Sequence, residues 1–275
     1  MYPILFQIGP FTISSFGMMM VVAFLLGNYL LRKDVIADGY DPILAEDITF
    51  RAAIGGIIGA KIYYLIETIP TGQAADNING LIEIIAGIFT LSGGRIAGCI
   101  QNFGAGLVFL GGLMGGMAAV SWYVYRNKLN WFKVADWVAP VLILGHGIGR
   151  IGCFLVGDDY GIPSNLPWAC AFPQGLPPTN ELVHPTQLYE MAAYFTIFVY
   201  LRYSKRIQHF AGELIFKYLI LGGFARFMIE ILRTNTKYYF GLSGAQYLSI
   251  IMMIIGAYQI WKRRYLNVSH EHNVE

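Results

Sequence analysis

Charged residues are scarce in this sequence. Only 13% of its 275 residues are Asp, Glu, Lys or Arg, whereas 56% are hydrophobic. An average soluble domain carries about 25% charged residues. The deficit indicates a chain whose surroundings are mostly lipid. The formal net charge of +2 is small, so nothing in the composition points to nucleic-acid binding.

Cysteines are few, and their spacing to histidines matches no metal motif. Cys99, Cys153 and Cys170 do not form a disulfide framework, and we expect no bridge between Cys99 and Cys170 although both can lie outside the membrane. The two histidines of the final SHEHNVE are expected in a solvated tail, because no Cys–His spacing here resembles a metal site. The opening MYPILFQIGP has no basic segment, so we expect no cleaved signal peptide. Without repeats or linkers, residues 1–275 are expected to form a single transmembrane domain.

Long apolar stretches make up most of the chain. A membrane-spanning helix needs about 20 mostly apolar residues. The sequence therefore predicts an all-α polytopic membrane protein with about seven transmembrane helices. The stretch 81–91 is too short to span and is expected to lie on the membrane surface or to re-enter it. The seven segments lie near residues 13–31, 48–67, 104–125, 134–157, 186–203, 212–232 and 243–261.

Lysine and arginine are distributed unevenly among the loops. Because basic residues favour the cytoplasmic side of a membrane, this bias predicts an outer N-terminus and an inner C-terminus. The loops and tail that would then lie inside hold Arg32, Lys33, Arg126, Lys128, Lys133, Arg202, Lys205, Arg206, Lys262, Arg263 and Arg264. The outer loops hold only Arg95, Arg233 and Lys237.

Glycines recur at a spacing of four residues inside several segments. Small residues at this spacing let helix backbones approach closely in lipid, so we expect most of these glycines to serve packing. The pairs are Gly55 and Gly59, Gly112 and Gly116, and Gly145 and Gly149.

Three basic residues lie deep within apolar segments. Lys61, Arg150 and Arg226 belong to three different predicted helices, each in the outer half of the membrane. A charge at the centre of a membrane helix costs about 2.5–3.5 kcal/mol, and such charges are usually paired or functional. We expect the three cations to form a site for an anionic group such as a lipid phosphate. A structural pair between Arg226 and Glu230, four residues apart, is the alternative for Arg226.

The densest polar motif, GHGIGRIGCFLVGDDYG, occupies residues 145–161 at the end of the fourth segment. Asp158 and Asp159 fall at the outer membrane boundary, where they either end the helix as solvated carboxylates or orient Arg150 or a substrate. His146 precedes Arg150 by one helical turn and shares its face. It is either a packed residue or a participant in the chemistry.

The loop over residues 166–190 contains several prolines and Trp168, which predict an ordered periplasmic cap over the membrane surface. His184 lies just before the fifth segment, where Gln187 and Glu190 enter the membrane. Intramembrane glutamine and glutamate need polar partners. We therefore expect these two side chains to lie near the cations.

Six segments of the chain resemble motifs of one protein family. GRIGCFLVGDDYG is similar to the signature GR-x-GNF-x-N-x-E, and HPTQLYE closely matches HP[ST]QLYE, with these two motifs in the same order along the chain. The family that the segments resemble is prolipoprotein diacylglyceryl transferase. The resemblance implies seven spans, an outer N-terminus, and a multi-pass protein of the bacterial inner membrane. The segments are IGPFTISSFGMMM at 8–20, GLVFLGGLMGG at 106–116, GRIGCFLVGDDYG at 149–161, HPTQLYE at 184–190, FARFMIEILR at 224–233 and LSGAQYLS at 242–249.

The resemblance also implies a reaction. Diacylglyceryl moves from phosphatidylglycerol to the lipobox cysteine thiol of a prolipoprotein, glycerol-1-phosphate leaves, and no metal or other cofactor takes part. A thiol needs a base or a positive field to react, and a departing phosphate needs cations. Our hypothesis is that Arg150 and Arg226 bind the phosphate with Lys61 assisting, because an arginine fork can hold two oxygens. Glu230 and Asp158 would orient these cations.

The remaining candidates come from the same motifs. His146 or His184 is the candidate general base for the thiol. Membrane lipid and the lipobox peptide are the expected partners. Further substrate-binding candidates are Gly152, Asp159, Gly161, Gln187, Tyr189, Glu190 and Arg233.

Several neutral polar positions depart from the family pattern. Two other interpretations therefore stay open: a divergent paralogue that binds phospholipid headgroups without this transfer, and a transporter of anionic solutes. A transporter typically shows internal repeats, and this sequence has none. The departures are Phe16, Leu110 and Gly222 at positions where members often carry His or Tyr, Cys153 and Val156 in place of asparagines, and Asp158 in place of glutamate.

Overall fold

The computed structural model describes residues 2–8, 11–71, 79 and 108–271. The chain divides into two compact units. The larger unit comprises Met1–Ile4, Ser14–Ala37 and Asn130–Glu275, and the smaller unit comprises Leu5–Ile13 and Asp38–Leu129. The predicted surface segment at 81–91 lies outside the described residues.

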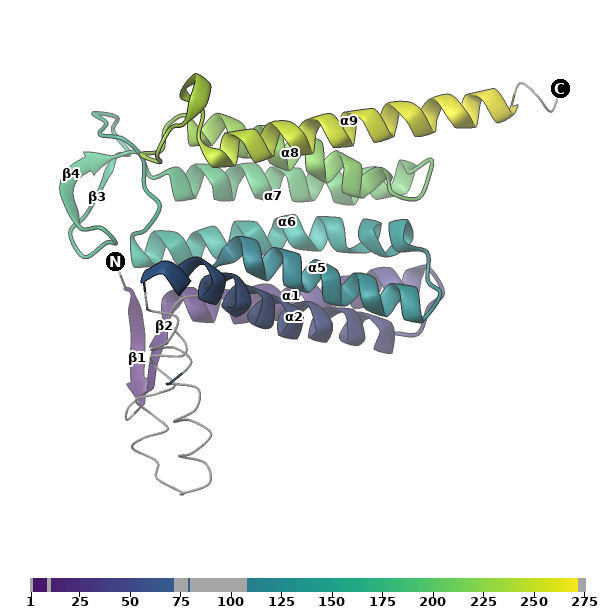
Figure 1. Ribbon diagram of the computed structural model, residues 1–275, viewed down its shortest axis with the longest axis horizontal. Helices are drawn as coiled ribbons and strands as arrows, with labels where there is room; N and C mark the ends of the chain where they lie inside the picture. The colour runs from purple at the N-terminus through teal and green to yellow at the C-terminus, as the bar shows by residue number, and fades with distance from the viewer. Residues whose placement is uncertain (1, 9–10, 72–78, 80–107, 272–275) are drawn as a thin grey trace. The chain divides into compact units, whose positions relative to one another are not determined.

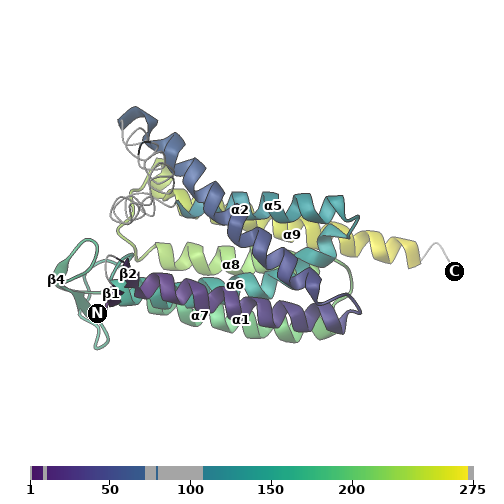
Figure 2. The same cartoon turned by 90° about the horizontal axis from the view of Figure 1, so that it is seen from below.

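The larger unit is a helical bundle. Helix α6 contacts α1, α7 and α8, and α9 packs against α8. Figures 1 and 2 show α6, α7 and α8 running lengthwise beside one another. The bundle buries aliphatic and aromatic side chains such as Ile143, Leu201, Leu214 and Tyr218. The helices are α1 (Ser15–Ala37), α6 (Trp131–Val156), α7 (Thr186–Ser204), α8 (Glu213–Glu230) and α9 (Gly244–Glu271).

Helix α6 has a defined start and end. The Asn130 side chain accepts hydrogen bonds from the backbone N–H groups of Phe132 (3.0 Å) and Lys133 (3.3 Å), which satisfies donors that a helix start leaves open. Gly157 ends the helix in a left-handed conformation with φ of 80°, which glycine adopts without steric cost. The chain therefore turns sharply where the two aspartates of the signature motif follow.

An ordered segment connects α6 to α7, as the prolines of the loop predicted. It contains the antiparallel strands β3 (Cys170–Phe172) and β4 (Thr179–Val183). Figure 1 shows this hairpin at the end of the bundle where α6 ends and α7 begins. We call this end of the larger unit the cap end.

The smaller unit packs α2 (Ile43–Thr68) against α5 (Phe109–Arg126). A Cβ atom added at Gly55 would lie 2.7 Å from the Gly115 carbonyl oxygen, and one at Gly59 would lie 2.7 Å from the Gly115 Cα. The packing role predicted for Gly55 and Gly59 is therefore confirmed, and Gly115 meets both of them. A Cβ at Gly116 would also lie close to α2, 3.1 Å from the Ala52 carbonyl oxygen.

The glycine pair in α6, Gly145 and Gly149, does not contact a neighbouring helix backbone in this way. A Cβ added at Gly145 would meet nothing within 4 Å, and one at Gly149 would meet only the Met20 sulfur at 4.0 Å. The prediction that this pair supports close helix packing is therefore wrong among the described residues. Four-residue spacing aligns two glycines on one helix face, but a neighbouring backbone must also approach that face.

All seven predicted segments are helical over most of their described length. The first begins later than predicted, because residues Phe11–Ser14 form strand β2 after β1 (Ile4–Ile8). The Ser14 side chain then accepts the N–H of Gly17 at 3.0 Å and caps α1. The predicted residues 104–107 lie outside the described part of the chain.

Within the residues that the structure describes, three helices are long and apolar enough to cross a membrane by length and composition. They are Ser15–Ala37, Trp131–Val156 and Gly244–Arg264. With the predominantly helical content, they support a polytopic helical membrane protein. The number of seven spans and the orientation stay predictions.

Candidate functional site

Two arginines from different helices share one buried carboxylate at the cap end. Arg150 of α6 pairs through Nε with Oε2 of Glu190 on α7, and Arg226 of α8 pairs through Nη1 with Oε1 of the same residue. The Glu190 side chain is 1% exposed. A carboxylate buried to this degree needs positive partners. The structure thus brings Arg150, Arg226 and Glu190 together.

Glu230 and Arg233 extend this network at the end of α8. Glu230 Oε2 lies 2.9 Å from Arg226 Nη2 and 3.8 Å from Arg233 Nε. Arg233 Nη1 lies 3.6 Å from Glu190 Oε1. The Arg226–Glu230 pair considered as a purely structural alternative therefore exists, but it belongs to a larger ionic network.

Asp159 completes the group that we call the arginine cluster. Its Oδ2 accepts a hydrogen bond of 2.7 Å from Arg150 Nη1, and its Oδ1 pairs with Arg233 Nη2. Burial would raise the pKa of this carboxyl, but Arg233 and Arg150 together hold it below its ordinary value. Asp159 is therefore an anion at neutral pH. The arginine cluster comprises Arg150, Asp159, Glu190, Arg226, Glu230 and Arg233.

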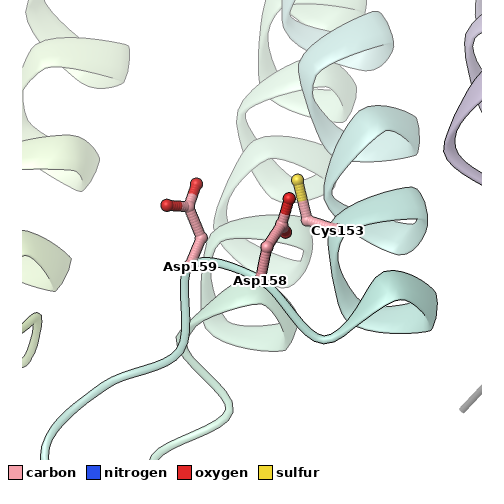
Figure 3. A group of neighbouring side chains, drawn as sticks. All are labelled: Cys153, Asp158 and Asp159. Carbon is pink, nitrogen blue, oxygen red and sulfur yellow. The ribbon is translucent and has the colours of Figure 1, made fainter. Parts of the chain in front are cut away.

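Asp158 has a different environment from its neighbour. Figure 3 shows its carboxyl group next to the Cys153 thiol, with the Asp159 carboxylate farther from the sulfur. The Asp158 Oδ1 atom is buried and has no hydrogen-bond partner within the described part of the chain. Burial raises the pKa of Asp158 above its ordinary value. This carboxyl is therefore easier to protonate than an ordinary aspartate.

Cys153, Asp158 and Asp159 are close enough to be considered as metal ligands. One ligand atom from each lies within 4.8 Å of the others. However, Arg150 Nη1 lies 3.5 Å from the Cys153 sulfur and also binds Asp159. A guanidinium at this position repels a divalent cation and already uses the carboxylate that such an ion would need. The arrangement suits an anion better than a metal ion.

Residues of α7 hold the turn that carries the two aspartates. Gln187 Nε2 donates to the Asp158 carbonyl at 2.5 Å, and Thr186 Oγ1 donates to the Asp159 carbonyl at 2.7 Å. The Gly161 N–H donates to the His184 carbonyl at 2.9 Å. A Cβ at Gly161 would lie 2.6 Å from the Leu232 carbonyl oxygen, so this position excludes a side chain. In this structure, Gln187 and Gly161 fix the backbone beside the cluster.

The cap contributes a chain of polar aromatic contacts. The His184 Nδ1 atom lies 3.2 Å from the Tyr189 hydroxyl, which accepts a 2.7 Å hydrogen bond from Trp168 Nε1. His146 lies elsewhere, on α6, with ring centroids of Tyr194 and Tyr218 at 6.0 and 6.3 Å. The two histidines proposed as bases therefore have separate surroundings.

Lys61 and Gly152, two further candidates from the sequence, are not members of the arginine cluster. Lys61 lies on α2 of the smaller unit and is buried, so its contribution to the phosphate site stays a prediction. A Cβ at Gly152 would lie 3.0 Å from the Phe16 Cα, so this glycine allows α1 and α6 to approach closely.

Several described residues of the site were not predicted from the sequence as candidates, among them Ser243, Asn235 and Cys153. Ser243 Oγ and Asn235 Nδ2 donate to Glu230 Oε1 at 2.8 and 2.6 Å, and Cys153 lies against Arg150. Ser243 belongs to the LSGAQYLS segment, and Cys153 to the signature motif, so both stood in recognisable motifs. Asn235 had no such signal, because its contact depends on the path of the loop after α8.

These features define a class: a polytopic helical membrane protein that buries arginines and carboxylates where three helices meet a capping loop. A model of the family "Prolipoprotein diacylglyceryl transferase" matches residues 3–262. The chain therefore belongs to the prolipoprotein diacylglyceryl transferase family and is a transferase.

Relatives named phosphatidylglycerol–prolipoprotein diacylglyceryl transferase agree with this assignment. The relative from Photobacterium profundum is 34% identical, covering 93% of this chain and 90% of its own length. The relative from Aliivibrio salmonicida is 33% identical, covering 92% of this chain and 84% of its own. The relative from Clostridium tetani is 32% identical, covering 94% and 96%. The resemblance inferred from the six sequence segments is confirmed.

Proposed function

We propose that this enzyme transfers the diacylglyceryl group of phosphatidylglycerol to the lipobox cysteine of a prolipoprotein and releases glycerol-1-phosphate. The names of the relatives supply both substrates. The observation that carries the mechanism is the pairing of Arg150 and Arg226 with the single carboxylate of Glu190. The shared carboxylate holds the two guanidinium groups close to each other, where both can bind the phosphate of an anionic headgroup.

The bond changes explain why such cations are needed. The substrate thiolate attacks the glyceryl carbon, a C–S bond forms, and the C–O bond to phosphate breaks with its electron pair leaving on oxygen. The phosphodiester starts with one negative charge, and the departing monoester gains a second. Groups that bind this growing charge stabilise the transition state more than the bound substrate, which is the requirement for catalysis.

Arg150 and Arg226 are the proposed phosphate ligands, and Lys61 is proposed to assist them. Both arginines project from helices and are aligned by Glu190, so little reorganisation is needed when charge develops. Glu230 positions Arg226 and is itself held by Ser243. Arginine suits this role because its planar fork can contact two phosphate oxygens at once.

The thiol proton needs an acceptor. His146 and His184 are the candidates from the sequence. The structure supports Asp158 as a third, because its buried carboxyl has an oxygen without a hydrogen-bond partner in the described part of the chain. A carboxyl whose pKa is raised is a stronger base than an ordinary one once it is ionised.

The membrane arrangement belongs to the same proposal. Seven helices cross the bacterial inner membrane with the N-terminus outside, and residues 1–275 act as a single transferase domain. The cap over residues 166–190 then lies on the periplasmic side, where the arginine cluster meets the outer leaflet. The excess of basic residues in the loops assigned to the cytoplasm supports this orientation.

Reconstitution tests the proposed reaction. Purified protein in phosphatidylglycerol vesicles is incubated with a lipobox peptide, and the thioether product and released glycerol phosphate are measured. We expect product from the wild type and none from Arg150→Ala. Arg202→Ala is the control, because Arg202 pairs with Asp34 at the opposite end of the bundle, and it should retain wild-type activity. Full activity of Arg150→Ala would contradict the mechanism, and headgroup binding without product would favour the non-transferring alternative.

A further inference from the structure

Asp159 is the most exposed carboxylate of the arginine cluster. Its side chain is 42% exposed, whereas those of Glu190 and Glu230 are each 1% exposed. Glu190 and Glu230 also project from helices, while Asp159 lies on the turn after α6. If one carboxylate leaves the network to admit a ligand, the exposed one on the turn can do so at the lowest cost.

The formal charges of the arginine cluster balance only when Asp159 is included. Three guanidinium groups face three carboxylates, so the cluster as built is neutral. When the Asp159 carboxylate leaves its position between the arginines, the remaining cluster carries one net positive charge. A phosphodiester carries one negative charge, so its entry in place of Asp159 restores neutrality. Burial of an unbalanced charge, which would be costly, is thereby avoided.

The contacts of Asp159 resemble those of a phosphodiester. One carboxylate oxygen binds Arg150 and the other binds Arg233. A phosphodiester likewise has two charge-bearing oxygens that can bind two guanidinium groups. The Asp159 carboxylate thus occupies a binding position whose hydrogen-bond donors could also bind a phosphate group.

Exchange of the Asp159 carboxylate for a phosphate group requires only movement of the Asp159 side chain. Thr186 Oγ1 holds the Asp159 carbonyl at 2.7 Å, and Gln187 holds the preceding carbonyl. The backbone at Asp159 has φ of 60°, a conformation in which aspartate is more common than most residues. Rotation of the carboxylate into solvent therefore leaves the turn and its hydrogen bonds in place.

We infer that Asp159 is an internal competitor for the headgroup phosphate. Its carboxylate fills the binding position between Arg150 and Arg233, and the phosphodiester of phosphatidylglycerol displaces it, so that Arg233 joins Arg150 and Arg226 as a phosphate ligand. The return of the carboxylate then helps to expel glycerol-1-phosphate. The inference rests on the proposed function. The product monoester carries more negative charge than the substrate diester, so the cations hold it more strongly. A returning carboxylate offsets that stronger binding and keeps product release fast.

Asp159→Asn tests this role, because asparagine has the same shape and tolerates the same backbone conformation but carries no charge. We expect the KM for phosphatidylglycerol and the inhibition constant of glycerol-1-phosphate each to fall about fivefold, since a neutral hydrogen bond competes less well than a charged one. The kcat should fall as well if product release limits turnover. Glu181→Gln in β4 is the matched control, because it removes one exposed negative charge from the cap outside the cluster, and its constants should equal those of the wild type.

Asp159→Gly provides a second variant that suits the positive φ and should change both constants in the same direction. A KM that is unchanged or raised in the folded variants, with an active wild type and an inactive Arg150→Ala, overturns the inference and leaves the proposed function intact. An inactive wild type, or an active Arg150→Ala, overturns the proposed function itself.

Discussion

The two ends of the larger unit use buried carboxylates in different ways. At the cap end, the partners of Glu190 among the described residues are arginine side chains from α6, α8 and the loop after α8. At the opposite end, Asp136 of α6 accepts backbone N–H groups from Gly212 at 2.5 Å and Ile215 at 3.0 Å, together with the Gln208 side chain. Asp136 thereby ties the start of α8 to α6.

The different partners of Glu190 and Asp136 distinguish a ligand-binding site from a contact that stabilises the fold. Backbone amides at the start of a helix cannot be given up without loosening that helix. Guanidinium groups can exchange one anion for another while the helices that carry them stay in place. A buried carboxylate held by amides therefore indicates a role in stability, and one held by several arginines beside an exposed anion indicates a ligand site.

The largest effect should follow from Arg226→Lys. A lysine keeps the charge but cannot make the two-pronged contact, so we expect kcat/KM to fall about 100-fold or more. The measurement is steady-state transfer to a lipobox peptide. Arg202→Lys at the opposite end is the control and should retain activity. Equal losses in both variants would remove the distinction between the two ends.

Asp136→Ala should lower stability and leave activity nearly unchanged, the reverse of what we expect for Arg226→Lys. It leaves the N–H groups of Gly212 and Ile215 without their acceptor, so we expect the free energy of unfolding to fall by about 2–4 kcal/mol. The kcat/KM of the folded protein should stay near the wild-type value. Thermal unfolding in detergent, paired with activity below the transition, checks both quantities. Unchanged stability with lost transfer would assign Asp136 to the chemistry instead.

Asp158→Asn should change stability in a pH-dependent way. Because burial raises the pKa of Asp158, its folded form favours the neutral carboxyl. Stability from this group is fully present below the pKa of the unfolded chain and is lost as the pH rises through the folded pKa. The variant should therefore unfold at a higher temperature than the wild type at neutral pH, and the gap should close in acid. A gap of the same size at every pH would contradict this assignment.

The smallest effect concerns glycines of α6 between the two ends. Gly145→Ala should stabilise the protein by about 0.5–1 kcal/mol, because its Cβ meets nothing within 4 Å and alanine favours the helix. Gly147→Ala should destabilise it, because a Cβ there would lie 2.6 Å from the Phe195 ring. Unfolding temperatures of the two variants give the comparison, and the same sign for both would contradict it.

The sequence predicted the helices well because each is a long apolar run, a property that does not depend on tertiary contacts. The gathering of Arg150 and Glu190 also followed from a general rule, since intramembrane charges need partners. The first segment was predicted two residues too early, because the Ser14 cap decides where α1 begins. Apolar length alone does not encode such a capping contact.

The details of the site required the structure. The sequence placed Asp158 and Asp159 together at the membrane boundary without showing that their side chains separate, one to Cys153 and the other to Arg150 and Arg233. That separation depends on the left-handed turn at Gly157 and on φ of 60° at Asp159. Adjacent residues of identical type cannot be distinguished by spacing, and only the turn assigns them different surroundings.

Calorimetric binding of glycerol-1-phosphate tests most directly whether the arginine cluster holds the headgroup phosphate. The wild type and Arg150→Lys are compared in detergent at one salt concentration, after thermal unfolding has shown that both are folded. The account predicts that the lysine variant binds at least about tenfold more weakly, because it loses the two-pronged contact with the phosphate oxygens. Equal affinity in the two proteins would contradict the assignment of the phosphate to this cluster.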